Sequence, residues 1–321
     1  MRFLAFDELT PEMDTERLLI HAASLGGAVD RNIVRVWQRR SSLYADYVGV
    51  FAVERGHVVG QTYVKRLRYT FRDGTETVGA VASVGGHPGF ARRGIARRIL
   101  REVHRREREA GIPFITLWTN RSWGAHRLYE ELGYRDVYQV PWALRLWPGR
   151  IPRRSRPAGV RPGRPEDLPE IDRLHDALAA ERLGFVHRPR RFLETGADVR
   201  DFDPAKELVV LRRGGRIRGY ALPQRSGVRA MCGELFADSA GTRRALVDEI
   251  ERRSPGRIVA FQQTPVTDLA AELARRGYSA LRAGWYVYMV ADLRGAGRER
   301  DARVRFATTD PRFLCMQADR F

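Results

Sequence analysis

A short segment rich in glycine and arginine has the residue types that bind phosphate. Residues 84–96 read Val-Gly-Gly-His-Pro-Gly-Phe-Ala-Arg-Arg-Gly-Ile-Ala. Small residues let a bulky anion approach the backbone amides, and Arg92 and Arg93 add positive charge. A helix that begins here would leave its first N–H groups unpaired, and its dipole would favour an anion. The segment predicts a site for a phosphorylated ligand; taken alone, it also fits an ordinary turn with surface arginines.

The flanking sequence predicts a strand before this segment and a helix after it. Residues 77–84 are β-branched or small, as in a buried strand. Ile95, Ile99 and Val103 then recur every four residues, so one face of the following helix is apolar. Gly111 supplies a stop for that helix.

Two common phosphate-binding motifs are excluded here. The chain has no G-x-x-x-x-G-K-[ST] sequence, which excludes a nucleotide triphosphate P-loop. No G-x-G-x-x-G follows the predicted strand, which excludes the dinucleotide-binding fingerprint.

A second strand and helix follow at once and complete a recognisable pattern. Residues 112–119 predict a strand, and residues 122–132 predict a helix that ends at Gly133. The whole run from Val81 to Tyr134 resembles the acyl-CoA-binding core of the GNAT superfamily of N-acyltransferases. The sequences HPGFARRGIARRIL and AHRLYEELGY are similar to the two signatures of that core.

The resemblance implies an α/β (α+β) fold and an acetyl-CoA cosubstrate, without a metal. In this family the edge of the first strand holds the pantetheine, and the loop amides hold the pyrophosphate. Three positions depart from the family pattern: Ala91 replaces Gln or Arg, Ala96 replaces a glycine and Ser122 replaces Asn. The expected coenzyme contacts are Val84, Gly85, Gly86, Ala91, Arg92, Arg93, Gly94, Ile95, Ala96 and Ser122.

The resemblance also implies a general acid, Tyr129, for an acetyl transfer in which an amine attacks directly in a ternary complex. A phenol with a pKa of about 10 can protonate a departing thiolate whose pKa is about 8.5. A half-buried core aromatic is the alternative reading of Tyr129. The base stays open among Glu8, Glu12, Asp46, Glu76 and a water chain. Similarity to tandem enzymes of the Eis type adds the C-terminal carboxylate of Phe321.

The chain looks like a tandem duplication. Residues 50–60 and 208–219 share a strand–turn–strand layout, and Gly-Tyr pairs at 133–134 and 277–278 each follow a short predicted helix. We therefore expect tandem GNAT folds, each with a mixed, mostly antiparallel central sheet flanked by helices. The expected parts are a catalytic domain (1–147), an Arg/Pro-rich linker (148–159), a degenerate second domain (160–293) and a docked C-terminal tail (294–321).

The second copy is expected to have lost the site. Its counterpart of the phosphate loop lies within residues 231–242 and contains Glu234 and Asp238, which would repel a pyrophosphate. Leu273 stands at the offset from the Gly-Tyr pair that Tyr129 has in the first copy. A structural or substrate-shaping role is expected for this copy.

Composition restricts the kinds of protein, membrane, secreted or cytoplasmic, that the chain could be. The 321 residues contain no run of eighteen apolar residues, and the acidic start at Asp7 and Glu8 disfavours a secretory signal. The two cysteines, Cys232 and Cys315, lack metal spacing, so a cytoplasmic location is expected. The acceptor is expected to be a small-molecule or peptide amine, and both a monomer and a homo-oligomer fit the sequence.

The net charge of +18 raises the alternative of a nucleic-acid-associated protein. We discount it because almost all of the cations are arginines, as in the product of a GC-rich genome, with Lys65 and Lys206 as the lysines. The arginines are also interspersed with acids, which is typical of a solvated surface. A CoA-binding sensor that transfers nothing is the other alternative.

Overall fold

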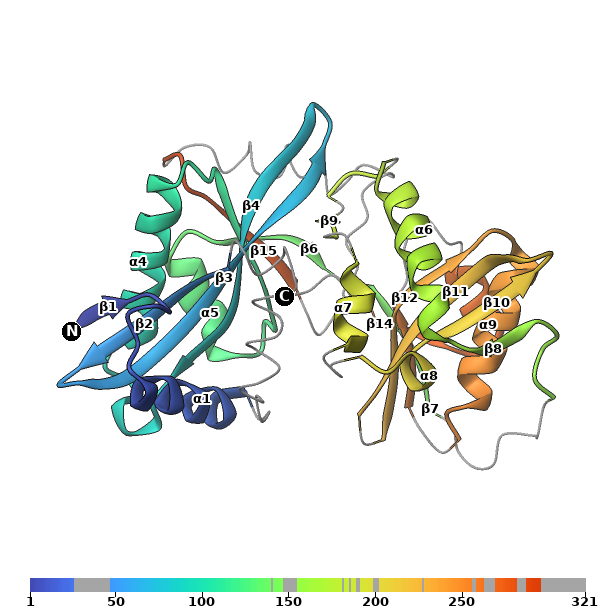
Figure 1. The fold of residues 1–321 in the computed structure, drawn as a ribbon, viewed down its shortest axis with the longest axis horizontal. Coiled ribbons are helices and arrows are strands. Elements are labelled where there is room, and N and C mark those ends of the chain that lie inside the picture. Colours follow the sequence, from blue (N-terminus) through green and yellow to red (C-terminus); the bar gives the residue numbers. More distant parts are fainter. Residues whose placement is uncertain are drawn as a thin grey trace.

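The chain forms two mixed sheets flanked by helices, seen side by side in the computed structural model (Figure 1). The structure describes residues 1–25, 47–139, 141–146, 155–180, 182–184, 186–188, 191–198, 202–226, 228–255, 258–262, 269–281 and 287–295. Most of the expected linker (148–159) and of the expected tail (294–321) therefore lies outside the described residues. The tandem α/β fold that the sequence predicts is confirmed.

The first half contributes most of one sheet and three longer helices. Its elements are β1 (Arg2–Leu4), α1 (Pro11–Leu25), β2 (Tyr47–Glu54), β3 (His57–Phe71), β4 (Gly74–Gly86), a 3-10 helix (Pro88–Phe90), α4 (Ile95–Glu109), β5 (Phe114–Thr119), α5 (Gly124–Glu131), β6 (Arg135–Gln139) and β7 (Trp142–Leu146).

The second half repeats much of this order and adds β9, α7 and α8 after its first long helix. Its elements are β8 (Val160–Pro162), a 3-10 helix (Pro165–Asp167), α6 (Leu168–Ala180), β9 (Val186–His187), α7 (Phe192–Asp198), α8 (Pro204–Glu207), β10 (Val209–Arg213), β11 (Arg216–Ser226), β12 (Arg229–Ala237), α9 (Ala240–Arg252), β13 (Ile258–Gln262), α10 (Leu269–Arg275), β14 (Ser279–Leu281) and β15 (Val287–Asp292).

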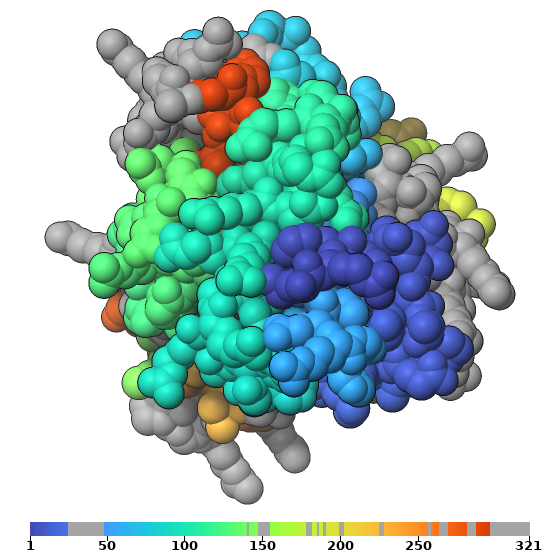
Figure 2. All heavy atoms as spheres, turned by 90° about the vertical axis from the view of Figure 1, so that its left-hand side faces the viewer, coloured from blue at the N-terminus to red at the C-terminus, as the bar shows by residue number. Residues whose placement is uncertain are grey.

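The two halves exchange strands: the first half contributes β7 to the second sheet, and the second half contributes β15, as well as β9, to the first sheet. The first sheet runs β1-β2-β3-β4-β5-β15-β6, and the second runs β14-β7-β13-β12-β11-β10-β8. The late strand β15 pairs antiparallel with both β5 and β6, while β7 lies between β13 and β14. In Figure 1, β15 is the red strand among blue and green ones. The spheres of Figure 2 show the same red segment packed against the first half, where Arg108 donates to the carbonyl of Leu293 over 3.1 Å.

Successive side chains of a strand point to opposite faces of a sheet, so both faces of the first sheet have apolar side chains that helices cover. Val50 and Ala52 of β2 face a core that includes α4 and α5, with Ile99 and Tyr129 among its members. Phe51 and Val53 face the other way, into a cluster with Leu4, Met13 and Ile20 of β1 and α1. The first sheet therefore has an α1 face and an α4/α5 face.

A strand of the second half extends the first sheet at the β3–β4 hairpin. Residues Val186 and His187 of β9 pair with Tyr69 and Arg68 of β3. The His187 ring lies 2.8 Å from the Thr70 hydroxyl, and Gly184 donates its N–H to the Thr70 carbonyl over 2.8 Å. This contact and the exchanged strands join the two halves.

No helix in the described part of the chain is long and apolar enough to cross a membrane. Cys232 is buried in β12 as a free thiol, and Cys315 lies outside the described residues.

Candidate active site

The predicted phosphate loop lies between β4 and α4 and has an unusual backbone. His87 caps the short 3-10 helix by accepting the Gly89 N–H at Nδ1 over 3.0 Å. Arg92 and Gly94 both have left-handed backbones, with φ of 62° and 69°. Glycine adopts this conformation without strain, and Gly94 directly precedes the first residue of α4.

The loop presents unpaired backbone amides. Among the described residues, none accepts a hydrogen bond from the backbone nitrogens of residues 92–97. Residues 91–94 are exposed, whereas Ile95 is buried under the helix start. The arrangement can bind an anion through N–H groups and the positive end of the α4 dipole.

The loop arginines differ in their contacts. A nitrogen of the Arg93 guanidinium lies 3.0 Å from the Glu54 carboxylate, and the group stacks 5.0 Å from the centre of the Phe90 ring. Arg92 is exposed and has no ion-pair partner among the described residues. Arg97, in the first turn of α4, pairs with Glu131 and so ties α4 to α5.

The first sheet opens beside the loop. Strands β4 and β5 pair in parallel at Gly79 with Ile115 and at Ala80 with Thr116, and no further pairs are formed between them in the described residues. On the other side of β4, the register with β3 shifts between Gln61 and Tyr63. Ser83 lies in this bulge with a φ of 54°. Residues 81–86 of β4 therefore have no ladder partner in β5 among the described residues.

Tyr129 lies on the α4/α5 face, where the motif predicts an acid. It is buried, and its carbonyl accepts the N–H of Tyr134 over 3.1 Å, which fixes the turn after α5. Its hydroxyl has no hydrogen-bond partner within the described ranges. Burial raises the pKa of Tyr129 to about 12, so the phenol is protonated at neutral pH.

Ser122 contacts a residue that the motif did not single out. Its hydroxyl donates to Oδ1 of Asn120 over 2.8 Å, and its N–H donates to the same oxygen over 2.9 Å. Asn120 thereby shapes the turn between β5 and α5, and the coenzyme contact of Ser122 stays a prediction.

The carboxylates considered as bases lie apart from the loop. Glu8 accepts the N–H of Ala5 over 2.6 Å, and Glu12 is exposed in the first turn of α1. Glu76 pairs with Tyr69 near the start of β4, whose other end leads into the loop. Asp46 and Phe321 lie outside the described residues.

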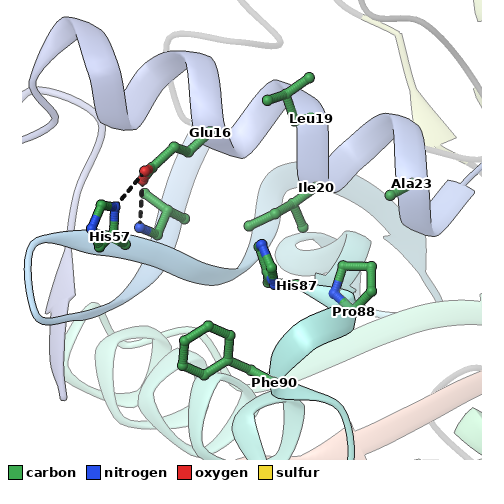
Figure 3. Close-up of a pocket in the computed structure, with 9 residues that line it drawn as sticks. Glu16, Leu19, Ile20, Ala23, His57, His87, Pro88 and Phe90 are labelled. Atoms are coloured by element: carbon green, nitrogen blue, oxygen red, sulfur yellow. Dashed lines mark hydrogen bonds and ion pairs between the residues drawn. The ribbon is translucent and has the colours of Figure 1, made fainter.

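A pocket of about 500 Å³ lies between α1 and the loop (Figure 3). Its walls are mostly apolar, and Nδ1 of His57 lies 2.7 Å from the Glu16 carboxylate at one end. Burial opposes ionisation of Glu16, but hydrogen bonds from His57 and the Val58 N–H, together with nearby His87, lower its pKa overall. The lining residues are Glu16, Leu19, Ile20, Ala23, His57, Val58, His87, Pro88 and Phe90.

A chain of polar side chains that sequence reasoning missed runs between α1 and β3. Arg17 donates to the Tyr63 hydroxyl over 3.1 Å, and that hydroxyl lies 3.2 Å from Oε1 of Gln61. The Gln61 amide nitrogen lies 3.4 Å from Nδ1 of His21. These residues match no motif, and only their approach in the folded chain reveals the network.

The second copy has lost the loop itself. Eight residues (87–94) separate β4 from α4, whereas two (238–239) separate β12 from α9. The chain caps α9 with its own groups: Ser239 accepts the N–H of Thr242 over 3.2 Å, and Asp238 accepts the Thr242 hydroxyl over 2.8 Å. No exposed anion cradle like that of α4 is formed there.

Glu234 does not lie in this turn, as the sequence suggested, but within β12. It is buried and accepts hydrogen bonds from the Arg188 guanidinium and, over 2.6 Å, from the Tyr220 hydroxyl. Leu273 does occupy the place of Tyr129, because Tyr278 donates to its carbonyl over 3.0 Å as Tyr134 does to that of Tyr129. An apolar side chain replaces the phenol there.

In the described part of the chain, no group of three or more His, Cys, Asp or Glu residues is arranged to hold a metal ion.

Three solved structures are similar in fold over nearly the whole chain. A probable N-acyltransferase of unknown function from Enterococcus faecalis has a TM-score of 0.65 at 12% identity, covering 91% of this chain and 72% of that one. An Eis protein from Mycobacterium abscessus has a TM-score of 0.59 at 16% identity, covering 91% and 74%. A tandem GNAT protein from the clavulanic acid biosynthesis pathway has a TM-score of 0.55 at 15% identity, covering 92% and 99%.

No curated protein sequence is significantly similar to the chain. A family described as the acetyltransferase (GNAT) domain matches residues 15–137, which hold the loop, the β4–β5 opening and Tyr129. The predicted resemblance is confirmed: residues 15–137 match an acetyltransferase (GNAT) domain, and the chain shares the fold of a tandem GNAT protein.

Proposed function

We propose that the first half transfers an acetyl group from acetyl-CoA to a primary amine, by direct attack in a ternary complex. The observation that carries this proposal is the row of unpaired amides at residues 92–97, next to the opening between β4 and β5. The loop amides and Arg92 would bind the pyrophosphate, and the strand edge at Val84, Gly85 and Gly86 would hold the pantetheine.

The opening would let groups from two different places, the bulge and the α4/α5 face, take part in the transfer. A backbone N–H in the bulge at Ser83 and Val84 would donate to the developing oxyanion. Tyr129, on the α4/α5 face, would protonate the departing thiolate. The amine nitrogen bonds to the acetyl carbon, the carbon–sulfur bond breaks, and the nitrogen loses a proton to a base.

The second half would serve as a scaffold. Its missing loop and its Leu273 leave no counterpart of the coenzyme cradle or of the phenol. Its strand β15 pairs with β5 at one wall of the opening, so we propose that it shapes the site.

Thiol release from acetyl-CoA, measured against a panel of amines, amino acids, peptides and polyamines, tests this function. We expect at least one amine to give turnover that depends on the protein. Calorimetric binding of CoA without any turnover would support a non-catalytic sensor instead. Binding to DNA or RNA with a steep salt dependence, in place of CoA binding, would support the nucleic-acid alternative.

A further inference from the structure

The polar network under α1 ends at a histidine next to the bulge of the first sheet. Gln61, whose amide contacts His21, pairs with Gly85 at the point where the β3–β4 register shifts. Helix α1 lies close over this point, because a Cβ on Gly85 would meet Ser24 at 3.0 Å and Ile20 at 3.5 Å. His21 therefore lies between α1 and the strands that carry the bulge.

His21 and Tyr129 lie on opposite faces of the first sheet. Tyr129 belongs to the core on the α4/α5 face, whereas α1 covers the other face. The β4–β5 opening lies beside the bulge, because the pairing of these strands ends at Ala80 and Thr116. A group on the α1 face can meet an incoming amine while the thiolate leaves toward Tyr129.

The charges around His21 favour a neutral imidazole. Burial lowers the pKa of His21, and the Arg17 guanidinium on the same helix lowers it further. From β3, the titratable neighbour in the network is Tyr63, and β4 contributes Gly85 and Gly86, which do not titrate. His21 is only partly buried.

Gln61 can fix the tautomer of this ring. The two ends of an amide side chain exchange places when the group turns by half a rotation. With its oxygen toward His21, Gln61 accepts the proton on Nδ1, and Nε2 then carries the lone pair. Its nitrogen then donates to the Tyr63 hydroxyl oxygen, which also accepts from Arg17, while the Tyr63 O–H proton turns away from Gln61.

We infer that His21 is the base of the acetyl transfer and that Gln61 positions it. This inference rests on the proposed function. As the amine nitrogen bonds to the acetyl carbon, its proton passes to Nε2 of His21. Tyr129 gives its proton to the thiolate, and both side chains regain their resting states by exchange with water. The Nε2 atom has no partner among the described residues, which leaves it available for this proton.

The test compares His21→Gln with wild type in thiol release, at saturating acetyl-CoA and amine, between pH 5 and pH 9. We expect kcat to fall about 100-fold, the usual contribution of a general base, while CoA binding changes less than about twofold. Because the pKa of His21 is lowered, the wild-type imidazole gains a proton only below the ordinary histidine value of about 6.5, and the acidic decline of kcat that this causes should be absent in the variant. Gln61→Leu should lower kcat about tenfold with a smaller effect on KM, as expected for a positioning residue.

Two further variants keep the result interpretable. His21→Ala leaves space in which added imidazole should restore part of kcat, and His187→Gln, in β9 of the second half, should retain the wild-type rate. A His21→Gln variant that folds, binds CoA and keeps the wild-type kcat would overturn the assignment. Loss of turnover on extending the chain beyond Phe321, with His21→Gln unaffected, would assign the base to the C-terminal carboxylate instead. Absence of turnover in the wild type overturns the proposed function itself, and the base assignment with it.

Discussion

The Arg93 guanidinium lies 3.0 Å from the Glu54 carboxylate, so one arginine of the phosphate loop is tied to the end of β2. Its neighbour Arg92 has no such partner among the described residues and projects from a left-handed backbone. Arg93 therefore ties the loop to β2, whereas the Arg92 guanidinium is available for a ligand.

Replacing Arg92 by Ala should weaken CoA binding about tenfold at low salt, because a charge-assisted hydrogen bond to phosphate is lost. The loss should shrink at high salt, which screens an exposed charge. Isothermal titration at two salt concentrations measures both. Arg213→Ala, an exposed arginine in the second half, is the control and should leave binding unchanged. Equal losses in the two variants would contradict a specific role for Arg92.

The backbone of Gly94 is a second test of the loop. Gly94→Ala meets no steric neighbour within 4 Å but forces an alanine into φ of 69°, which costs about 1 kcal/mol of stability. We expect this loss together with CoA binding about tenfold weaker, since the amides of the cradle shift.

Gly214→Ala is a matched control, because Gly214 has φ of 58°, no neighbour within 4 Å and a place in the β10–β11 turn. It should lose similar stability in chemical unfolding and bind CoA normally. If both variants bind CoA normally, the loop geometry is not what holds the coenzyme.

Tyr129→Phe should lower kcat about 100-fold while CoA binding stays within about twofold, because the hydroxyl acts only as the thiolate leaves. The pKa of about 12 implies that the wild-type phenol keeps its proton throughout the neutral and moderately alkaline range. The wild-type kcat should therefore not decline with rising pH through loss of this proton below about pH 11. A Tyr129→Phe variant as active as wild type would show that the aromatic ring has a packing role alone.

His104 predicts an acid-sensitive core. It is 6% exposed, its Nε2 lies 3.0 Å from the Tyr134 hydroxyl, and burial lowers its pKa to about 4. A depressed folded-state pKa means that stability is present above pH 6.5 and is lost as the pH falls toward 4, by up to about 3 kcal/mol. Urea unfolding at pH 7 and pH 4 should show this loss.

The double variant His104→Leu with Tyr134→Phe removes both partners and the titrating group. It should lose less stability than wild type over the same pH interval. An equal pH dependence in both proteins would locate the acid sensitivity elsewhere.

The sequence predicted those parts of the fold that local patterns specify. The strand, loop and helix around Gly94 follow from residue spacing and glycine placement, and the β2–β3 and β10–β11 hairpins lie where their turn glycines indicate. The exchange of β7 and β15 could not be predicted in this way. The sequence of a mostly apolar strand such as Val287–Asp292 does not indicate which sheet it joins. Its neighbours are selected by pairing with strands far away in the sequence.

The candidate site, like the fold, could be predicted from the sequence only in part. The loop and Tyr129 belong to contiguous motifs, so the sequence could point to them. His21 and Gln61 are 40 residues apart, and their contact depends on how α1 crosses β3. The short turn of the second copy could not be predicted either. Asp238 and Ser239 are typical of many polar turns, and only the start of α9 at Ala240 shows that the turn consists of these two residues.

The exchanged strand has a consequence for protein synthesis. Residues 287–292 form β15, which lies between β5 and β6 in the first sheet. This sheet, on which α5 with Tyr129 packs, therefore cannot be completed until nearly 300 residues have left the ribosome. A nascent chain that contains every residue of the loop still lacks one wall of its sheet. Synthesis of the second half thus has to precede completion of the sheet on which the first half is built.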